Sequence, residues 1–184
     1  AAFSDCKQIE FLEFSKDSEL VSIEDESFFK SSINQIIIPK HVKKIGKYAF
    51  SDCINLYLIE FEQISELSII EYSAFSNSGI KKILIPSNVE EIGKYAFSNC
   101  CNLECFEFQE NSKLSLINEN TFSFSEIKEI TIPKNVKEIK DYAFNFCSNL
   151  SFIDFEDNSE LNSLGTYLFC KSQIEIITIP SKIK

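Results

Sequence analysis

The segment Ile45-Gly46-Lys47-Tyr48-Ala49-Phe50-Ser51 recurs letter for letter as Ile92 to Ser98, 47 residues later. An Ala-Phe pair occurs four times at this spacing, at Ala2-Phe3, Ala49-Phe50, Ala96-Phe97 and Ala143-Phe144. A second series, again 47 apart, interleaves with the first at Phe28, Phe75, Phe122 and Phe169. Each double unit of 47 residues is therefore a long repeat of 25 residues followed by a short repeat of 22. Because internal repetition at a fixed period is typical of stacked repeat architectures, we expect eight repeats that form one array.

Each repeat continues with an apolar block of the form L-x-x-I-x-I/F. The blocks are Ile9-Leu12-Phe14, Ile33-Ile36-Ile38, Leu56-Ile59-Phe61, Ile80-Ile83-Ile85, Leu103-Phe106-Phe108, Ile127-Ile130-Ile132, Leu150-Ile153-Phe155 and Ile174-Ile177-Ile179. The last two apolar residues of each block are two apart, which is the period of a strand with one buried face. A strand of this length cannot bury its apolar face alone, so it needs neighbours stacked on both sides. The sequence thus predicts a parallel sheet of eight short strands over one continuous core.

The accompanying Ile-Pro, Val-x-x-Ile-Gly-x-x-Ala-Phe and Phe-x-x-Cys-x-x-Leu elements recur in fixed order along the whole chain. In this form the pattern resembles the BspA-like subclass of leucine-rich repeats. The resemblance implies an α/β horseshoe-type leucine-rich-repeat solenoid that is β-dominated. Its concave side would be a parallel sheet of about eight short strands, and its return side would hold short strands and turns with little helix. The resemblance also implies a cell-surface or secreted protein that acts in adhesion and partner binding, with a cytoplasmic location as the alternative.

Residues 1–184 are expected to form a single leucine-rich-repeat array. The chain begins within a repeat at Ala1-Ala2-Phe3 and stops within one at Ile179-Pro180 and the four residues that follow. Terminal capping repeats with polar outer faces are normally needed for solubility, and the sequence shows none. We therefore expect a fragment of a longer array, uncapped at both ends and able to self-associate through them.

The composition limits the kinds of partner and location that the chain can have. The net charge is −10 and all 18 basic residues are lysines. Without the planar fork of arginine, an acidic chain is a poor ligand for phosphates, so no nucleic-acid partner is expected. No apolar run approaches the ~18 residues of a membrane helix, so no membrane span is expected in this segment.

Catalytic residue types are also scarce. The chain has one histidine, His41, and no Gly-rich phosphate loop. We therefore predict no nucleotide site, and a Ser-His-Asp set could be built only around His41. Acidic side chains that recur with the double unit would lie about 10 Å apart on an open sheet, which suits neither geometry of a glycosidase. The sequence predicts no enzyme and no cofactor.

Four of the seven cysteines form one column, at Cys6, Cys53, Cys100 and Cys147, and serines take the same place in the short repeats, at Ser31, Ser78, Ser125 and Ser172. Neighbouring cysteines would be two strands apart, about 9–10 Å, which exceeds the ~7 Å that a disulfide allows. We expect small buried side chains that hydrogen-bond the loop backbone. Cys101 and Cys105 superficially suggest a metal pair, but His41 is far away and nothing supplies the other ligands, so no metal site is predicted.

Within each block, the third and fifth positions should point away from the core. The third positions are Phe11, Gln35, Leu58, Lys82, Cys105, Glu129, Phe152 and Ile176, and the fifth positions are Glu13, Ile37, Glu60, Leu84, Glu107, Thr131, Asp154 and Thr178. Long repeats pair an apolar third position with an acidic fifth position. Two explanations compete for this exposed mixture. Either repeat duplication copied residues that a broad sheet tolerates, or the face binds a protein through apolar anchors and acidic specificity.

Our prediction is a non-enzymatic protein-binding or adhesion module of a surface or secreted protein. Its partner would be a protein or host-surface ligand, including a basic one that the acids would steer. The predicted partner-binding residues on the concave face are Phe11, Glu13, Leu58, Glu60, Lys82, Leu84, Cys105, Glu107, Glu129, Phe152, Asp154 and Ile176. The alternatives are an intracellular leucine-rich-repeat scaffold or regulatory protein, and a structural spacer in a surface stalk.

Overall fold

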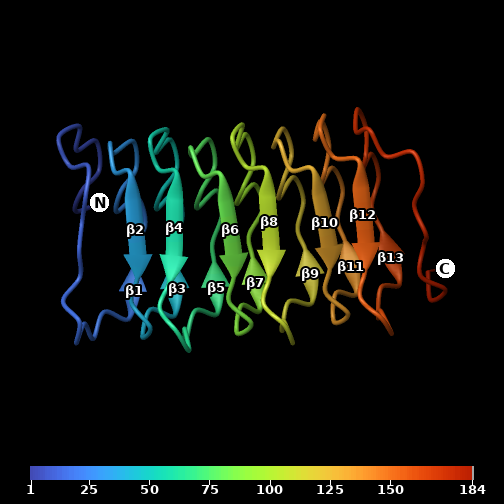
Figure 1. Ribbon diagram of the computed structural model, residues 1–184, viewed down its shortest axis with the longest axis horizontal. Helices are drawn as coiled ribbons and strands as arrows, with labels where there is room; N and C mark the ends of the chain where they lie inside the picture. Colours follow the sequence, from blue (N-terminus) through green and yellow to red (C-terminus); the bar gives the residue numbers. More distant parts are fainter. Residues whose placement is uncertain (184) are drawn as a thin grey trace.

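The computed structural model describes residues 1–183 and shows a stack of similar coils that follow one another along a single axis (Figure 1). Six four-residue strands, one per coil, form a parallel sheet in the order β12-β10-β8-β6-β4-β2, which we call the long-strand sheet. Its strands are β2 (Gln35–Ile38), β4 (Leu58–Phe61), β6 (Lys82–Ile85), β8 (Cys105–Phe108), β10 (Glu129–Ile132) and β12 (Phe152–Phe155). Neighbouring coils in the sequence are therefore neighbours in space, as the repeat predicts.

The return side of the coils carries two-residue strands and turns, and residues 1–183 contain no helix. One return sheet has the order β1-β3-β5-β7 and the other β13-β11-β9. Their strands are β1 (Ser22–Ile23), β3 (Lys44–Ile45), β5 (Ile69–Ile70), β7 (Glu91–Ile92), β9 (Leu116–Ile117), β11 (Glu138–Ile139) and β13 (Ser163–Leu164). The predicted class, a β-dominated leucine-rich-repeat solenoid, is confirmed.

The two return sheets are separated at one coil by a side chain. Elsewhere a backbone amide follows the return strand and donates to the preceding coil, as Gly93 N does to Ile70 O at 2.8 Å. Between β7 and β9, the Asn118 side-chain amide donates to Ile92 O at 2.8 Å instead. The Asn118 side chain thus donates to the Ile92 carbonyl oxygen, which would otherwise accept a backbone amide and continue the return sheet.

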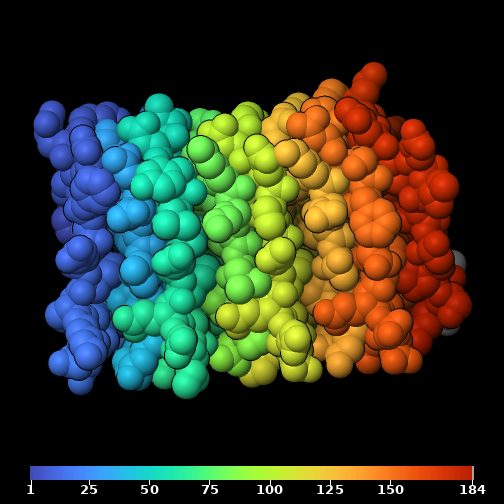
Figure 2. All heavy atoms as spheres, viewed as in Figure 1, coloured from blue at the N-terminus to red at the C-terminus, as the bar shows by residue number. Residues whose placement is uncertain are grey.

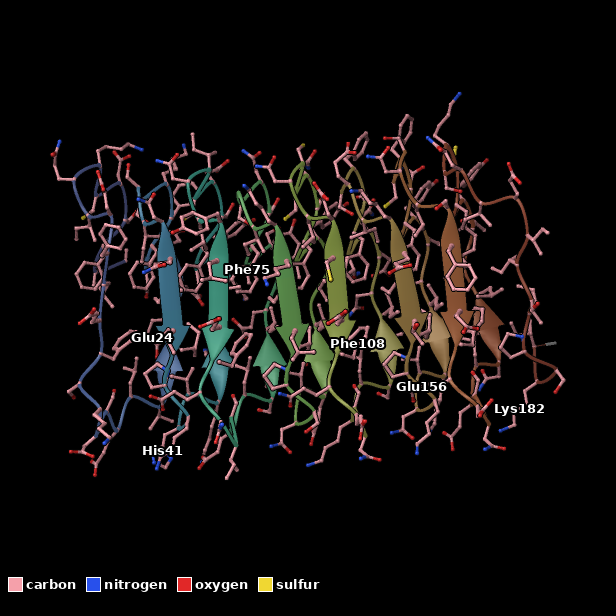
Figure 3. All side chains as sticks on the ribbon, viewed as in Figure 1. Glu24, His41, Phe75, Phe108, Glu156 and Lys182 are labelled. Carbon is pink, nitrogen blue, oxygen red and sulfur yellow. The ribbon has the colours of Figure 1, made fainter. Side chains whose placement is uncertain are left out.

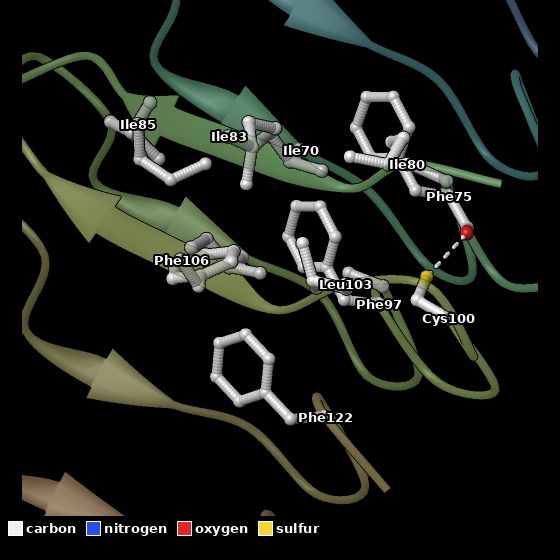
Figure 4. Close-up of a cluster of buried hydrophobic side chains, with 14 of the residues drawn as sticks. Ile70, Phe75, Ile80, Ile83, Ile85, Phe97, Cys100, Leu103, Phe106 and Phe122 are labelled. Atoms are coloured by element: carbon white, nitrogen blue, oxygen red, sulfur yellow. Dashed lines mark hydrogen bonds between the residues drawn. The ribbon is translucent and has the colours of Figure 1, made fainter. Parts of the chain in front are cut away.

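A column of phenylalanine rings runs through the core from Phe3 to Phe169. Phe50 and Phe75 stack with centroids 5.2 Å apart and parallel planes, and Phe75 and Phe97 stack at 5.2 Å with planes 7° apart. Figure 4 shows Phe75, Phe97 and Phe122 in this column beside the isoleucines of the strands. Phe50 and Phe97, which are 47 residues apart, therefore share one line through the molecule, as predicted.

The cysteine column lies beside the phenylalanines. The thiols of Cys53, Cys100 and Cys147 donate to the carbonyl oxygens of Phe28, Phe75 and Phe122 at 2.9, 3.1 and 3.0 Å. The serine of each preceding coil approaches within 3.5 Å, as Ser78 Oγ does to Cys100 Sγ. All seven cysteines are free, in agreement with the predicted reduced column. Burial raises the pKa of the Cys100 thiol to about 11, so this group stays protonated at neutral pH.

The long-strand sheet alternates between two kinds of step. From a short repeat to the following long repeat, as from β2 to β4, four residue pairs are in register. From a long repeat to the following short repeat, only one pair remains, Leu58 with Lys82 between β4 and β6 and Cys105 with Glu129 between β8 and β10. We call these tight and loose steps.

The extra residues of the long repeats account for the loose steps. The chain that follows β4 bonds backward to the preceding coil, because Glu62 N donates to Ile38 O at 3.0 Å and Glu66 N donates to Lys40 O at 2.7 Å. The end of each long-repeat strand is therefore held to the coil before it and separates from the coil after it. The last strand residue differs as well, since Phe61 is half-buried where Ile38 is fully buried.

The expectation of eight strands was wrong by two. The first block makes one isolated bridge, from Phe11 to Gln35, and residues 174–179 of the last block form no strand. Both blocks meet the rest of the sheet only across a loose step, where no more than one residue pair forms elsewhere in the sheet. A single pair is too little to define a strand, so six blocks have strand structure.

Candidate functional site

The candidate site is the outward surface of the long-strand sheet, which we call the sheet face. Figure 2 shows it in space-filling form, with side chains from every coil contributing to one continuous surface. The short-repeat strands alternate strictly, as in β2, where Ile36 and Ile38 are buried and Gln35 and Ile37 are exposed. In the long-repeat strands the second residue is buried and the last residue is half-buried. Two rows of side chains therefore cross the strands, one from the third and one from the fifth position of each block.

All twelve predicted residues point outward. Phe11, Phe152 and Ile176 are the most exposed apolar members, at 59%, 53% and 80%. Leu84 is also exposed, and Leu58 and Cys105 are half-buried. The charged members are exposed, and they are Glu13, Glu60, Lys82, Glu107, Glu129 and Asp154. Their outward orientation is confirmed, and their role in binding stays a prediction.

Strand register brings the third-position row together. Leu58 pairs with Lys82, Lys82 with Cys105, Cys105 with Glu129, and Glu129 with Phe152. In the fifth-position row the acids alternate with neutral residues, because Glu60 pairs with Ile37, Glu107 with Leu84 and Asp154 with Thr131. Successive acids of this row are thus separated by one intervening strand.

Sequence reasoning left Ile37 out of the twelve, although its side chain is 56% exposed on β2, at one edge of the long-strand sheet. Along four successive coils, the apolar residues are Phe11 in the third-position row, Ile37 in the fifth, Leu58 in the third and Leu84 in the fifth. The signal was present, since Ile37 occupies the fifth position of its block. The apolar part of the face is therefore a zigzag that crosses between the two rows.

Four hollows indent the sheet face, and each is lined by residues from both coils of a loose step, with the first three extending onto a further coil. The first has a volume of about 430 Å³ and lies between the first block and β2, and the second, of about 390 Å³, lies between β4 and β6. The others have volumes of about 710 Å³, between β8 and β10, and about 610 Å³, between β12 and the last block. The hollows follow from the separation of the strands.

Each hollow is lined by at least one acid from the fifth-position row and at least one apolar residue or cysteine from the third-position row. The first contains Glu13 and Phe11, and the second contains Glu60 and Leu58. The third contains Glu107 and Cys105, and the fourth Asp154 and Phe152. Sequence reasoning did not predict these hollows, although the unequal repeat lengths that produce them were visible.

The sheet face is predominantly negative. The two rows contain five carboxylates and one ammonium group, that of Lys82, which gives a net charge of −4. Within residues 1–183, the ion pairs of the chain lie elsewhere, for example between Lys94 and Glu119 at 3.0 Å, and none includes an acid of the two rows. Partial burial, with the nearby carboxylates of Glu107 and Glu129, raises the pKa of the Cys105 thiol, so this side chain adds no negative charge at neutral pH.

His41 lies away from this face. Its Nδ1 is 3.0 Å from Glu66 Oε1, and Figure 3 shows it beyond the end of the long strands. In the part of the chain that the structure describes, no three His, Cys, Asp or Glu side chains gather as a metal site. Nor does that part contain a helix that could cross a membrane.

Comparisons with known proteins agree with this architecture. The family model described as a BspA type Leucine rich repeat region matches residues 1–104 and 68–184. No curated protein sequence matches the chain.

Solved structures include several similar folds. The pneumococcal vaccine antigen PcpA is 23% identical, with a TM-score of 0.68 over 83% of this chain and 52% of its own. A leucine-rich repeat protein from Bacteroides ovatus is 26% identical, with a TM-score of 0.64 over 97% of this chain and 52% of its own. The T. pallidum leucine-rich repeat protein TpLRR is 23% identical, with a TM-score of 0.69 over 84% and 72%. The chain thus spans about half the length of the first two proteins, at 52% of each.

Proposed function

Because this chain belongs to the BspA-type leucine-rich-repeat family, we propose that it is a non-catalytic module that binds a protein ligand through the sheet face. The observation that carries the proposal is the composition of that face. Large apolar side chains such as Phe11, Ile37 and Phe152 are more than half exposed there, among carboxylates that form no ion pair within residues 1–183. Apolar residues that gather on one exposed surface mark interaction sites more often than scattered ones do.

The net negative charge of the sheet face favours a positively charged partner. A net charge of −4 on the sheet face attracts a basic protein and speeds its encounter, while the apolar zigzag supplies most of the contact area. The residues that bind are the twelve predicted ones together with Ile37.

The location proposed for the module is the cell surface or the extracellular space. The family and the printed description of the pneumococcal structure as a vaccine antigen support this location. The ligand would then be a protein of the host surface or of the surrounding matrix.

Adhesion of protein-coated beads tests the proposal. Beads carrying the wild-type chain are applied to epithelial monolayers and to immobilised matrix proteins, and retention is counted under flow. The variant Phe11→Asp/Phe152→Asp places charges on the two exposed aromatic anchors. Its matched control is Val21→Asp/Ile64→Asp, because Val21 and Ile64 are 55% and 90% exposed and lie off the sheet face.

Wild-type and control beads are expected to adhere, whereas adhesion of the Phe11/Phe152 variant should fall about tenfold or more, as expected when aromatic anchors of an interface are removed. Reversing the charge at Glu60, Glu107 and Asp154 should slow attachment and weaken its dependence on salt. Wild-type beads that adhere no better than uncoated beads would refute the binding function and leave the role of a spacer. Equal loss in the Val21/Ile64 control would show that adhesion does not use the sheet face.

A further inference from the structure

We infer that the array contains a hinge at one joint between successive coils, where the coil of β9 and β10 follows the coil of β7 and β8. The coils up to β8 form one rigid body, and the coils from β9 onward form the other. Rocking at this joint changes the angle between the two parts of the sheet face. The hinge is a property of the fold and exists whether or not the face binds a protein.

The return strands are not bonded to each other at this joint. In the intact joint between β3 and β5, Glu71 N donates to Ile45 O at 2.9 Å. Within residues 1–183, β7 and β9 form no bonded strand pair, and the Asn118 side-chain amide donates to Ile92 O instead. A side chain can change its rotamer without moving the backbone, so this contact fixes the distance between the coils less firmly than a backbone ladder does.

The sheet-face side of the same joint is a loose step. Strands β8 and β10 share one residue pair, Cys105 with Glu129, at the beginning of both strands. The loose step between β4 and β6 differs, because the bonded return strands β3 and β5 lie behind it. Among the loose steps between the strands of residues 1–183, only the one from β8 to β10 therefore lacks a return ladder.

The core is also widest at this joint. Phe97 and Phe122 stack with centroids 5.9 Å apart, which is the largest separation in the phenylalanine column. The Phe106 ring meets both of them edge-on, at 5.0 and 4.6 Å (Figure 4). The same position of β4 holds the smaller Ile59. Phe106 thus occupies space between the two coils and keeps their rings apart.

The remaining connections define the axis of the hinge. The turn before β8 is bonded to the next coil, since Phe97 N donates to Thr121 O at 2.9 Å and Asn99 N to Ser123 O at 2.8 Å. At the opposite end of the coil, the loop between β8 and β9 carries the chain from one body to the other. The turn and the loop lie beyond opposite ends of the long strands, so the line that joins them runs along the strands (Figure 1). The two weakened edges lie on opposite sides of this line, which permits rocking about it.

Two ion pairs cross the joint without blocking this motion. Lys94 pairs with Glu119, and Lys128 pairs with Glu104. Each pair joins a residue between β7 and β8 to a residue between β9 and β10, so both lie at the turn end of the coils, near the axis. Their lysines are exposed and have flexible stems, which lets the pairs persist while the coils rock.

The hinge divides the sheet face. The apolar zigzag of Phe11, Ile37, Leu58 and Leu84 belongs to the first body, and Phe152 belongs to the second. The hollow between β8 and β10, which has the largest volume of the four at about 710 Å³, lies at the joint itself. Rocking therefore widens or narrows this hollow and adjusts the curvature of the face.

Pairs of spin labels placed 47 residues apart test the hinge, because the repeat supplies matched controls. Nitroxides are attached to genetically encoded keto side chains, so the native thiols stay unlabelled, and dipolar broadening of the EPR spectra gives the distance distribution. On the sheet face, Lys82/Glu129 spans the hinge, and Gln35/Lys82 spans the same order of tight and loose steps without it. All three positions are exposed.

The return side is labelled in the same way. Glu90/Lys137 spans the interruption between β7 and β9, and Lys43/Glu90 spans the continuous ladder from β3 to β7. These positions are exposed as well. The distance distribution across the hinge should be about twice as wide as that of its control, or wider, on both sides of the array.

Repair of the joint should remove the difference. The variant Asn118→Glu/Phe106→Ile installs the residues found 47 positions earlier, Glu71 and Ile59, and should narrow both hinge-spanning distributions to the width of their controls. Asn118→Glu alone leaves the core unchanged and should narrow Glu90/Lys137, which preserves the test if the double variant does not fold. Glu71→Gln, at the equivalent position of an intact joint, is the control variant and should leave all four distributions unchanged.

Equal widths for the hinge-spanning and control pairs would overturn the inference. Distributions that stay wide across the hinge in Asn118→Glu and in the double variant would also overturn it, because the interrupted ladder would then not be the cause. The labels report on the chain without a ligand, so these outcomes are independent of whether the coated beads adhere.

Discussion

Replacing Phe97 by alanine removes a ring from the middle of the phenylalanine column. The side chain is fully buried and has three aromatic neighbours. It stacks on Phe75 at 5.2 Å and on Phe122 at 5.9 Å, and it meets Phe106 edge-on at 5.0 Å. The cavity would lie between the stacked rings of the two neighbouring coils.

The cost follows from these contacts. Truncation of a buried phenylalanine typically destabilises a protein by about 3–5 kcal/mol through lost transfer free energy and the cavity left behind. Three aromatic pairs, each contributing about 0.5–1.5 kcal/mol, place Phe97→Ala at the upper end, near 5 kcal/mol. The neighbouring Cys100→Ser is expected to cost about 1 kcal/mol or less, because the hydroxyl can still donate to Phe75 O and the short repeats already hold serine in this column.

Urea unfolding followed by circular dichroism measures the difference. With a slope of about 2.5 kcal/mol per molar urea, Phe97→Ala should lower the midpoint by about 2 M, and Cys100→Ser by less than about 0.5 M. Phe97→Leu keeps most of the volume and should fall between them, which preserves the comparison if the alanine variant does not fold. Phe11→Ala, at an exposed position, is the matched control and should shift the midpoint by little. Equal shifts for Phe97→Leu and Phe11→Ala, or for Phe97→Ala and Cys100→Ser, would refute the assignment of the column.

Three further predictions concern the backbone and the thiols. Gly93→Ala should destabilise the chain by about 2 kcal/mol or more in the same urea assay, because a Cβ there would lie 2.7 Å from the carbonyl carbon of Glu71. Glu90→Ala, at an exposed position, is the control, and an equal effect of both substitutions would contradict the close approach of the backbone at Gly93. Burial raises the pKa of the Cys100 and Cys147 thiols to about 11, so their contribution to stability is complete below the ordinary value of 9.0 and is lost as pH rises toward 11. The free energy of unfolding should therefore fall between pH 9.0 and 11, and Cys100→Ser/Cys147→Ser should flatten that fall, whereas an unchanged slope would show that these thiols are not the cause. In a thiol-reagent assay at pH 8, exposed Cys101 should react before Cys100, and simultaneous reaction would contradict the burial of the column.

The columns could be predicted from sequence because each is repeated at a fixed spacing. Phe50 and Phe97 had to be equivalent once a seven-residue segment recurred 47 positions later, and the outward side of each strand followed from the two-residue period. The identity of the binding residues remains a prediction, because orientation alone does not distinguish a binding face from a tolerated one.

The turns could not be predicted in the same way. Each turn that carries a core phenylalanine from Phe28 to Phe169 has left-handed residues two positions before and after the ring, such as Tyr48 and Asp52, with φ of 55° and 58°. Glycine is the usual signal for this conformation, yet these positions hold tyrosine, asparagine, aspartate, serine, lysine, glutamate and phenylalanine. The stacked neighbours impose the conformation through backbone hydrogen bonds, such as the 3.1 Å bond from Tyr48 N to Tyr72 O, and no local residue type indicates it.

The loose steps could not be predicted from the sequence either. The sequence shows that long repeats have additional residues, but it does not show whether the loop they form bonds to the coil before or after it. Only the backbone bonds of Glu62 and Glu66 to the preceding coil decide that question.

The alternation of tight and loose steps has a mechanical consequence. When the array is pulled along its length, it should separate first at the loose steps, where the fewest strand pairs resist. The molecule should therefore extend in increments of two coils, each releasing 47 residues. At about 3.5 Å per residue, one such event lengthens the tether by roughly 160 Å and absorbs the load before the next pair of coils is disturbed.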